Sequence, residues 1–477
     1  MTVLRRSVAR AIVTIAAFGT LALVTGLLTP AAGAAGGSKA VSVPASIDAT
    51  GATDVTDALQ DFLATVPNGS TITFPEGAQY RVDGSLGINT KRNLTIEGNG
   101  ATVFATTEGD RTRSQWNIVA STRIVFRDLV VKGANPAGGV GDAAYKAELE
   151  AQHGFNIIGS VGIELDGVTV TDVYGDFVYV GQRKGTDWSR KIWVHDSTFA
   201  RNGRQGIAVT AGREIVLERN TIGDTRRATF DLEPNNTEGG AEDVFILDNT
   251  VGQGRLRFVA SHGRGPVDDI TISGNRLEGI ALTVDVVSPG DQHRTGWWVG
   301  ENSSTQDADR TPLLFTRVDE VVVRNNIQPV EVRDGNAGVG LRDVCGATVE
   351  NNSFGPGVQQ FTVGGTECGA AASIAEPEAP TIRDRDPESR VVLPVQVEPG
   401  TSTSVPGATT APASTAAPTT TTTRAGTAPG DPGDDGGTDV MVYVIGAALV
   451  LAVAGIVVGL VMRSRRSRSH RYYRSYE

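Results

Sequence analysis

A pattern of eight residues recurs through the middle of the chain and constrains its fold more than any other feature. Its template is apolar, any, apolar, any, any, Asn, any, apolar, as in Ile215–Ile222, where the Asn is Asn220. Further copies carry Asn249, Asn275, Asn326 and Asn352, and degenerate copies begin at Leu94, Ile124, Ile163 and Ile192. Successive copies start 23 to 39 residues apart, except for one interval of 51 residues, so we expect a copy near residues 280–300 to have lost the pattern.

This repeat predicts a β-solenoid. Alternating apolar residues indicate a short strand, and the turn that follows leads into another strand. A repeat of 23–30 residues with several strands and no helix forms one coil, stacked about 4.8 Å above the last. Equivalent Asn side chains can then hydrogen-bond along the axis, and Asn tolerates a left-handed bend. We therefore predict an all-β parallel solenoid over residues 45–370, with a structural Asn column.

The composition favours the same fold. The 58 Gly residues and the aromatic content of 6% suit many short strands joined by tight turns. A solenoid also needs a cover over its open end, which the segment Asp54–Ala64 can supply as an amphipathic helix. The apolar face of this helix would consist of Val55, Leu59, Phe62 and Leu63. We expect an N-terminal capping helix there.

Residues 1–34 have the features of a secretory signal peptide. Arg5, Arg6 and Arg10 form a charged region, an apolar stretch follows over residues 11–28, and small residues at positions 32–34 suit cleavage. We therefore expect the chain to be exported, with an uncleaved N-terminal anchor as the alternative.

The C-terminal part indicates a membrane anchor on a stalk. Residues 371–438 are rich in Pro, Thr, Ala and Gly and have little to bury, which predicts a disordered linker. Residues 439–462 predict a transmembrane helix, because the charge-free run from 440 would span about 34 Å. Six Arg residues in the tail, 463–477, then place the C-terminus in the cytoplasm. We expect a monomeric, single-pass cell-membrane protein with an extracellular β-helix.

The net charge restricts the partners. The formal charge is −11, and without the basic clusters at the two ends the body has 34 basic and 53 acidic residues. A body this acidic should not attract nucleic acid through its phosphates. It could bind a neutral glycan, or an acidic glycan through a local Arg patch or a metal ion. We therefore expect a polysaccharide or cell-wall glycan as partner.

The chain has two cysteines, Cys345 and Cys368, both on the side expected to be exported. Exported cysteines are more often paired than free. Their separation of 23 residues is close to one coil, which would place them in stacked positions about 5 Å apart. We predict a disulfide that joins the last coils.

A stretch near the start resembles a known family. Asp48–Gln60, followed by Phe74-Pro75-Glu76-Gly77 and Tyr80, is similar to the opening of pectate-lyase-superfamily β-helix proteins, here of an actinobacterial, membrane-anchored type. The resemblance extends to about residue 365. It implies a right-handed parallel β-helix, in a superfamily of polysaccharide lyases, glycoside hydrolases, epimerases and noncatalytic surface proteins. The polygalacturonase-type branch is not expected, because its Asn-Thr-Asp, Asp-Asp and His-Gly signatures do not occur in order.

Six apolar-x-apolar triplets indicate a further strand in each coil, after the Asn turn. In such a triplet the first and third residues point inward and the middle residue points outward. The outward residues would stack on one face: Asn156, Val178, Ala208, Asp231, Arg257 and Thr283. Asp176, Glu233 and Asp285 would share this face, flanked by His153, Arg204, Gln205, Arg226, Arg227, Arg255 and His262.

This face carries the candidate catalytic chemistry. Asp231 and Glu233 lie two apart on a strand, so both should face outward with Cα atoms about 6.6 Å apart. The pair could hydrolyse a glycosidic bond, or could bind Ca²⁺ that neutralises a uronate for β-elimination. In the second case Arg257 or Arg204 would steady the developing charge. His153 would be the base, because the Lys expected from calcium-dependent lyases of this architecture is missing.

The remaining polar residues complete two competing interpretations. In the first, a cell-surface lyase or glycoside hydrolase binds its substrate through Arg204, Asp176, Asn156 and Arg227. In the second, the acids only pair with neighbouring Arg residues, and the protein is a noncatalytic adhesin or wall-associated scaffold. His195 and His293 are expected at the surface, and Trp297-Trp298 in a loop packed on the solenoid.

Overall fold

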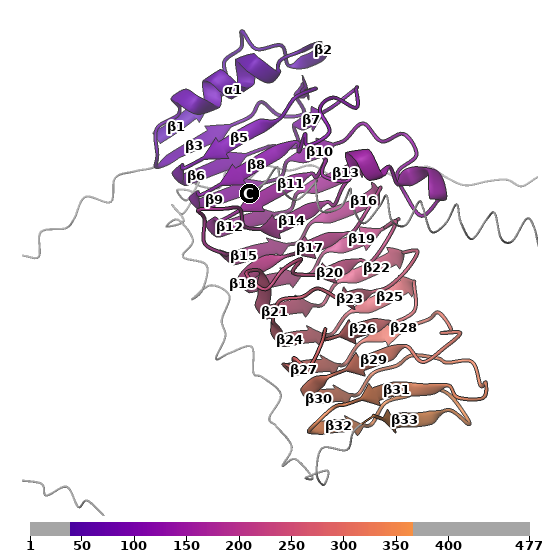
Figure 1. The fold of residues 1–477 in the computed structure, drawn as a ribbon. Helices are drawn as coiled ribbons and strands as arrows, with labels where there is room; N and C mark the ends of the chain where they lie inside the picture. Colours follow the sequence, from indigo (N-terminus) through magenta and orange to yellow (C-terminus); the bar gives the residue numbers. More distant parts are fainter. Residues whose placement is uncertain (1–38, 366–477) are drawn as a thin grey trace, which may run out of the picture. The chain divides into compact units, whose positions relative to one another are not determined.

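Three parallel β-sheets run along the chain and close around a common core (Figure 1). The structure, a computed structural model, describes residues 39–365. These residues form a right-handed parallel β-helix, so the fold predicted from the repeat and implied by the family resemblance is confirmed. The expected signal peptide, linker, transmembrane helix and cytoplasmic tail lie outside the described residues. Within residues 39–365, no helix is long and apolar enough to cross a membrane.

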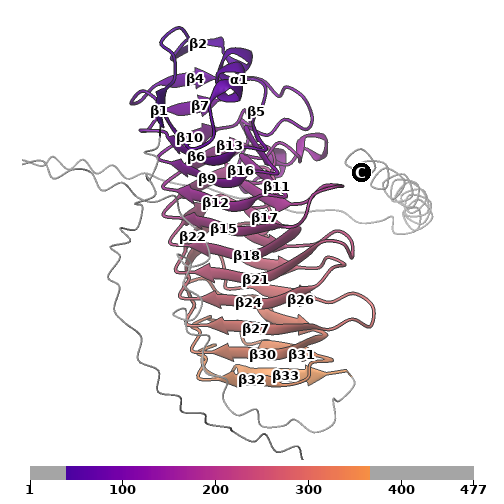
Figure 2. The same ribbon diagram turned by 90° about the vertical axis from the view of Figure 1, so that its left-hand side faces the viewer.

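The first sheet has twelve strands, one for each coil, and Figure 2 shows its later strands stacked one above the next. Its strands are β1 (Lys39–Ser42), β3 (Ser70–Thr73), β6 (Arg92–Glu97), β9 (Thr122–Arg127), β12 (Val161–Asp166), β15 (Ser189–His195), β18 (Ala211–Glu218), β21 (Gly240–Leu247), β24 (Val267–Ser273), β27 (Arg294–Gly300), β30 (Val318–Arg324) and β32 (Ala347–Glu350). This 12-stranded sheet contains the first half of the sequence repeat.

The second sheet follows the Asn turn and has ten strands. Its strands are β2 (Thr50–Asp54), β4 (Gln79–Arg81), β7 (Thr102–Phe104), β10 (Val130–Lys132), β13 (Thr169–Val173), β16 (Thr198–Asn202), β19 (Thr221–Gly223), β22 (Thr250–Gln253), β25 (Arg276–Gly279) and β28 (Ser303–Ser304). From β9 to β28, two residues separate each strand of the 12-stranded sheet from the following strand of this 10-stranded sheet.

The third sheet completes each coil and has eleven strands. Its strands are β5 (Leu86–Asn89), β8 (Trp116–Val119), β11 (Phe155–Ile158), β14 (Val178–Gly181), β17 (Ile207–Val209), β20 (Phe230–Leu232), β23 (Val259–Ser261), β26 (Val284–Val287), β29 (Leu313–Thr316), β31 (Ala337–Arg342) and β33 (Gln359–Gly364). The connections into and out of this 11-stranded sheet vary in length, and the candidate site lies among them.

The copies of the repeat stack in register, as the sequence predicts. The first apolar residues of neighbouring copies are direct partners, for example Ile192 with Ile215, and Ile215 with Val244. The interval of 51 residues contains one further copy of the repeat, and this copy departs from the pattern, as expected. Trp297 occupies the apolar position of that copy on β27, and its Asn is Asn302. Ser304 replaces the last apolar residue of the template in this copy. Trp297-Trp298 therefore lies on a strand and not in a loop.

A ladder of Asn side chains joins the coils at the turn between the first two sheets. Asn220 donates its backbone N–H and its side-chain Nδ2–H to Oδ1 of Asn249, both at 3.0 Å. Asn249 bonds in the same way to Asn275, at 3.0 and 2.9 Å, and also donates to the Leu217 carbonyl oxygen. The ladder continues through Asn302 and Asn326 to Asn352. These side chains are buried, so the hydrogen bonds of the ladder take the place of hydrogen bonds to water. They satisfy both the side-chain amides and the backbone groups of the turn.

The left-handed bend lies one residue earlier than expected. The residue before the ladder Asn has a positive φ, at 52° for Arg219, 51° for Asp248 and 70° for Gly274. The ladder Asn does not take this conformation, because its own side chain must lie between the coils to bond its neighbour. The bend therefore falls on a residue whose side chain is free to face outward.

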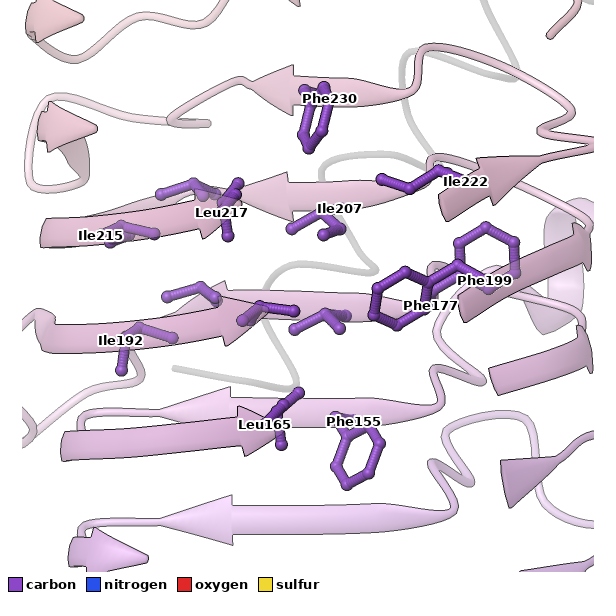
Figure 3. Packing of buried hydrophobic residues seen from close by; sticks show 14 of the residues in the cluster. Phe155, Leu165, Phe177, Ile192, Phe199, Ile207, Ile215, Leu217, Ile222 and Phe230 are labelled. Atoms are coloured by element: carbon purple, nitrogen blue, oxygen red, sulfur yellow. The ribbon is translucent and has the colours of Figure 1, made fainter. Parts of the chain in front are cut away.

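Inward-facing side chains from all three sheets fill the interior (Figure 3). Phe155, Phe177, Phe199 and Phe230 lie within it, and the rings of Phe177 and Phe199 have centroids 5.5 Å apart. Close packing of alternate residues fixes which side chains point outward, since a shift of one residue would bury polar groups. The core thus determines which residues form the outer faces.

One α-helix, α1 (Thr56–Thr65), lies at the N-terminal end of the described stack (Figure 1). Leu59 and Leu63 are buried, whereas Phe62 is only partly buried against the core. That this helix protects the end of the solenoid stays a prediction. The disulfide also stays a prediction, because Cys368 lies outside the described residues.

Replacement of one ladder residue tests the role assigned to the Asn column. In the Asn249→Ala variant, two donors of Asn220 and the Leu217 carbonyl would lose their partner, at a cost of about 1–3 kcal/mol for each unsatisfied group. We expect the urea midpoint of unfolding to fall clearly, while Asn235→Ala, at an exposed loop position, leaves it unchanged. Equal midpoints for both variants would contradict a stabilising ladder.

Candidate functional site

The outward residues of six consecutive strands, β11 to β26, form one strip on the 11-stranded sheet. Strand pairing places them one above the next: Asn156, Tyr179, Ala208, Asp231, Ala260 and Asp285. We call these six positions, with the polar side chains that contact them, the outer strip. Asp231 faces outward because its neighbours on β20, Phe230 and Leu232, are both fully buried in the core.

Three of the six outward residues predicted from sequence are wrong. Val178 is fully buried and Tyr179 faces outward in its place. Arg257 and Thr283 precede β23 and β26, and the strip positions belong to Ala260 and Asp285. The triplets chosen from sequence included apolar residues of the preceding turn, where the chain length varies between coils. The predictions for Asn156, Ala208 and Asp231 are confirmed.

A pair of carboxyl groups lies at the centre of the outer strip. Asp231 is only 3% exposed, and Glu233, just after β20, is half-buried. Burial raises the pKa of Asp231 to about 8, with further contributions from the charge of Glu233 and from a hydrogen bond between the two carboxyl groups. The positive charge of Arg204 opposes this rise. The Asp231–Glu233 pair therefore favours keeping one proton as the pH rises toward neutral.

A third acid, Asp176, lies to one side of this pair and forms an ion pair with Arg204. Asp176 is fully buried and accepts hydrogen bonds from Arg204 Nη1 at 2.7 Å and from the Gln205 backbone at 2.9 Å. Burial raises the pKa of Asp176 to about 6, although Arg204 lowers it. The negative charge of Asp176 in turn raises the pKa of Asp231. The two acids thus favour different protonation states at neutral pH.

His153 lies beside Asp176 as a neutral ring. Its Nδ1 accepts the backbone N–H of Asp176 at 3.1 Å, so the proton of the neutral ring is on Nε2. Burial, with the nearby charge of Arg204, lowers the pKa of His153 well below its usual value. The ring also stacks on Tyr179 with centroids 4.8 Å apart. His153 therefore acts as an acceptor that orients this part of the outer strip.

A second cluster lies on the two coils that follow Asp231. Asp285 accepts from Arg257 Nε at 3.2 Å and lies 3.3 Å from His262 Nε2. The His262 hydrogen bond lowers the pKa of Asp285, and the same bond raises the pKa of His262. The negative charge of Glu233 also raises the pKa of His262, so the two clusters interact.

The buried Arg294 holds the segment that carries His262. Its guanidinium donates to the Ser261 carbonyl at 2.6 Å, to Ser261 Oγ at 2.8 Å and to the Gly263 carbonyl at 2.7 Å. Burial lowers the pKa of Arg294 to about 10. These bonds fix the backbone on both sides of His262. The sequence contains no sign of this role, because the contact spans a whole coil.

A long connection borders the outer strip on one side. Residues 133–154 leave β10 and return at β11, and contain two short 3₁₀ helices, η1 (Asp142–Ala144) and η2 (Ala147–Leu149). Glu150 of this connection lies 3.6 Å from Arg204 and accepts from Tyr145 at 2.9 Å. Arg227 stacks on the Tyr145 ring at 4.5 Å. Arg227 is therefore at the border of the site and not at its centre.

The structure thus brings together Asp231, Glu233, Asp176, Arg204 and His153, as expected from the sequence. Asn156 lies three strands from Asp231, and its Nδ2 donates to Asn117 at 2.9 Å. Glu150, Tyr179 and Arg294 were missed, since no repeat marks them. No group of three metal ligands occurs in the outer strip within residues 39–365.

Comparison with known proteins gives only distant structural likenesses. No family model and no curated protein matches the chain. The PfbA surface adhesin of Streptococcus pneumoniae is similar over 67% of this chain and 90% of its own, with 13% identity and a TM-score of 0.45. An endo-xylogalacturonan hydrolase from Aspergillus tubingensis is similar over 68% of this chain and 95% of its own, with 14% identity and a TM-score of 0.43. The tailspike of E. coli bacteriophage HK620 is similar over 68% of this chain and 65% of its own, with 15% identity and a TM-score of 0.45. The fold assignment accordingly depends on the strand pairing of this chain itself.

The raised pKa of Asp231 predicts a pH-dependent cost to stability. Between its unfolded value near 3.8 and about 8, the folded protein holds a proton that the unfolded chain does not, so stability falls as pH rises through this range. We expect Asp231→Asn to raise the free energy of unfolding at pH 8 by at least about 1 kcal/mol, the equivalent of one pKa unit. Unfolding measured at pH 5 and pH 8 checks this.

Asp285→Asn is the matched control for this measurement. Its pKa is lowered, so ionised Asp285 stabilises the fold above its unfolded pKa, and that stability is lost as pH falls. The Asn variant should therefore be less stable than the wild type at pH 7, the opposite sign to Asp231→Asn. Destabilisation in both variants at all pH values would contradict a protonated Asp231.

Proposed function

We propose that the outer strip binds a neutral glycan and hydrolyses its glycosidic bonds, with the Asp231–Glu233 pair as proton donor. The observation that carries this proposal is a buried carboxyl group, Asp231, hydrogen-bonded to a second carboxyl group, Glu233, with its pKa raised by burial and by that neighbour. Glycoside hydrolysis requires such a group, because the leaving oxygen must be protonated as the bond breaks.

The pair would act through one proton. It donates the proton to the glycosidic oxygen as the bond to the sugar carbon breaks, and water supplies the hydroxyl group of the new reducing end. The sugar develops positive charge in the transition state. The carboxylates left on the outer strip, with ionised Asp176 nearby, would stabilise that charge. After the reaction, the pair regains its proton from solvent.

The ion pairs of the outer strip favour a neutral sugar over a uronate. A uronate needs a cation for its carboxylate, but Arg204 is paired with Asp176 at 2.7 Å and Arg257 with Asp285 at 3.2 Å. β-Elimination also needs a base, and Nδ1 of His153 already accepts a backbone hydrogen bond. Lysis of a uronate, with or without Ca²⁺, is therefore the less favoured reaction.

A noncatalytic role is the second candidate, and the low exposure of Asp231 favours it. A carboxyl group that is 3% exposed reaches a substrate only if neighbouring side chains move. The outer strip would then hold a glycan without cleaving it, as in an adhesin or wall-associated scaffold. In either case we propose that the β-helix is displayed outside the cell on the C-terminal anchor expected from the sequence.

Incubation of the full chain with neutral and uronate polysaccharides, with and without Ca²⁺, separates these functions. We expect new reducing ends from a neutral glycan and no absorbance near 235 nm. Asp231→Asn should lower the rate by about 10²–10⁴-fold, since it removes the acid. The control Asp319→Asn changes a carboxylate on the 12-stranded sheet that pairs with His293, and should leave the rate unchanged. Glycan retention without any product would support the binder.

The pH profile gives a separate test of the proton donor. Because the pair must be protonated to act, the rate should decline as pH rises through about 8. Glu233→Gln removes the neighbouring negative charge that raises the pKa of Asp231, so any residual activity of this variant should decline at a lower pH. A rate that increases steadily up to pH 9 would exclude Asp231 as the acid.

A further inference from the structure

Three side chains able to bind a metal ion meet on the outer face of the 12-stranded sheet, away from the outer strip. Glu164 and Asp166 lie on β12, and His195 lies on β15, the next strand of that sheet. Asp166 and His195 are direct partners in the strand pairing. One ligand atom from each of the three residues lies within 4.8 Å of the others. Backbone register between two coils therefore holds this group together.

We propose that Glu164, Asp166 and His195 bind one divalent transition-metal ion of the Zn²⁺ class. The proposal does not depend on the function proposed for the outer strip. The sequence analysis placed His195 at the surface, but its side chain is buried among these acids. The pairing of its strand with β12 is what brings the three residues together.

A buried carboxylate oxygen in this group lacks a partner. Glu164 is 2% exposed, and its Oε2 has no hydrogen-bond partner within the described part of the chain. Such an oxygen lowers the stability of the fold, because it has lost its hydrogen bonds to water and has gained no hydrogen bond or ion in their place. A cation bound between Glu164, Asp166 and His195 would remove this cost.

The imidazole of His195 is oriented as in a metal ligand. Its Nδ1 lies 2.7 Å from Asp196 Oδ2, so this nitrogen can donate its proton to the Asp196 carboxylate. A second carboxylate that accepts from the far ring nitrogen is a common feature of histidine metal ligands. The other nitrogen, Nε2, then faces Glu164 Oε1 at 3.4 Å. Two ligands at about 2.0–2.1 Å from a tetrahedral ion lie about 3.4 Å apart, which fits this distance.

Arg127 supports the site without occupying all of its ligand atoms. Its Nε donates to Asp166 Oδ2 at 3.2 Å and its Nη1 donates to Glu97 at 3.2 Å. It also lies 3.8 Å from Glu164 Oε1. These contacts orient both acids and leave the Glu164 carboxylate for an ion, with Oε1 facing His195 Nε2 and Oε2 without a hydrogen-bond partner among the described residues. Asp166 Oδ1 lies 3.7 Å from His195 Nδ1, on the same side of the group. Acidic side chains outnumber the guanidinium groups around the site, and this excess of negative charge favours a cation. The five carboxylates are Glu97, Glu164, Asp166, Asp196 and Glu218, and the two guanidinium groups are Arg127 and Arg219.

The donor set indicates the class of metal. Imidazole nitrogen favours Zn²⁺, Ni²⁺ and Cu²⁺ over Ca²⁺, and two carboxylates with one histidine suit Zn²⁺. Three protein ligands leave a fourth position for water or another ligand. The site is therefore expected to exchange its metal more readily than a closed four-ligand site.

Titration of the chelator-treated full chain with Zn²⁺ tests the proposal. We expect one ion per chain to bind at this site, and Co²⁺ to give visible ligand-field absorption. Co²⁺ should also quench part of the tryptophan fluorescence, since the rings of Trp193 and His195 have centroids 3.9 Å apart. His195→Gln and Glu164→Gln should each weaken Zn²⁺ binding at least about tenfold. The control His293→Gln, which alters an exposed histidine paired with one carboxylate, should not.

Two outcomes would overturn the proposal: no saturable Zn²⁺ binding, or equal affinity in His195→Gln, Glu164→Gln and the wild type. If the variants fail to fold, X-ray absorption at the zinc edge of the loaded wild-type chain decides the question. One imidazole nitrogen and two carboxylate ligands are expected in that spectrum. A first shell without imidazole would place the ion elsewhere and refute the site.

Discussion

Everything in this structure depends on the hydrogen-bonded register between successive coils. Parallel strands fix each residue beside its counterpart one coil away, and the Asn ladder fixes the turn at which two sheets meet. Because Asn249 satisfies both its neighbour and the backbone, a shift of register would leave buried polar groups without partners. This constraint makes residues more than twenty positions apart into lateral neighbours, from which both candidate sites are built.

The same register explains what could be predicted from sequence. The apolar starts of the repeat have a constant position relative to the Asn turn, so Ile215, Val244 and Ile270 were placed correctly. The turns before the 11-stranded sheet vary in length and contain apolar residues such as Phe258, so local alternation does not identify the strand. Arg257 was misplaced for this reason. Contacts such as Arg294 with Ser261 cross between coils at positions that no repeat marks.

The two candidate sites show how one scaffold places carboxyl groups in different surroundings. On the outer strip, burial next to other acids keeps Asp231 protonated. On the 12-stranded sheet, Glu164 and Asp166 instead lie next to two basic side chains, Arg127 and His195. The backbone geometry of the two faces is similar. The difference comes from which side chains the neighbouring coils contribute, and the outer strip alone is bordered by a long connection.

The corners of the coil differ in how freely they can change during evolution. Between β9 and β28, the corner with the Asn ladder always has two residues, whereas the corner after β10 has accepted a segment from residue 133 to residue 154. An insertion at the ladder would separate every amide above it from its acceptor, so selection should remove it. An insertion at the other two corners leaves the ladder intact. New specificities in such a chain should therefore arise by loop growth around the 11-stranded sheet. The height of the stack of coils should change only by gain or loss of whole coils.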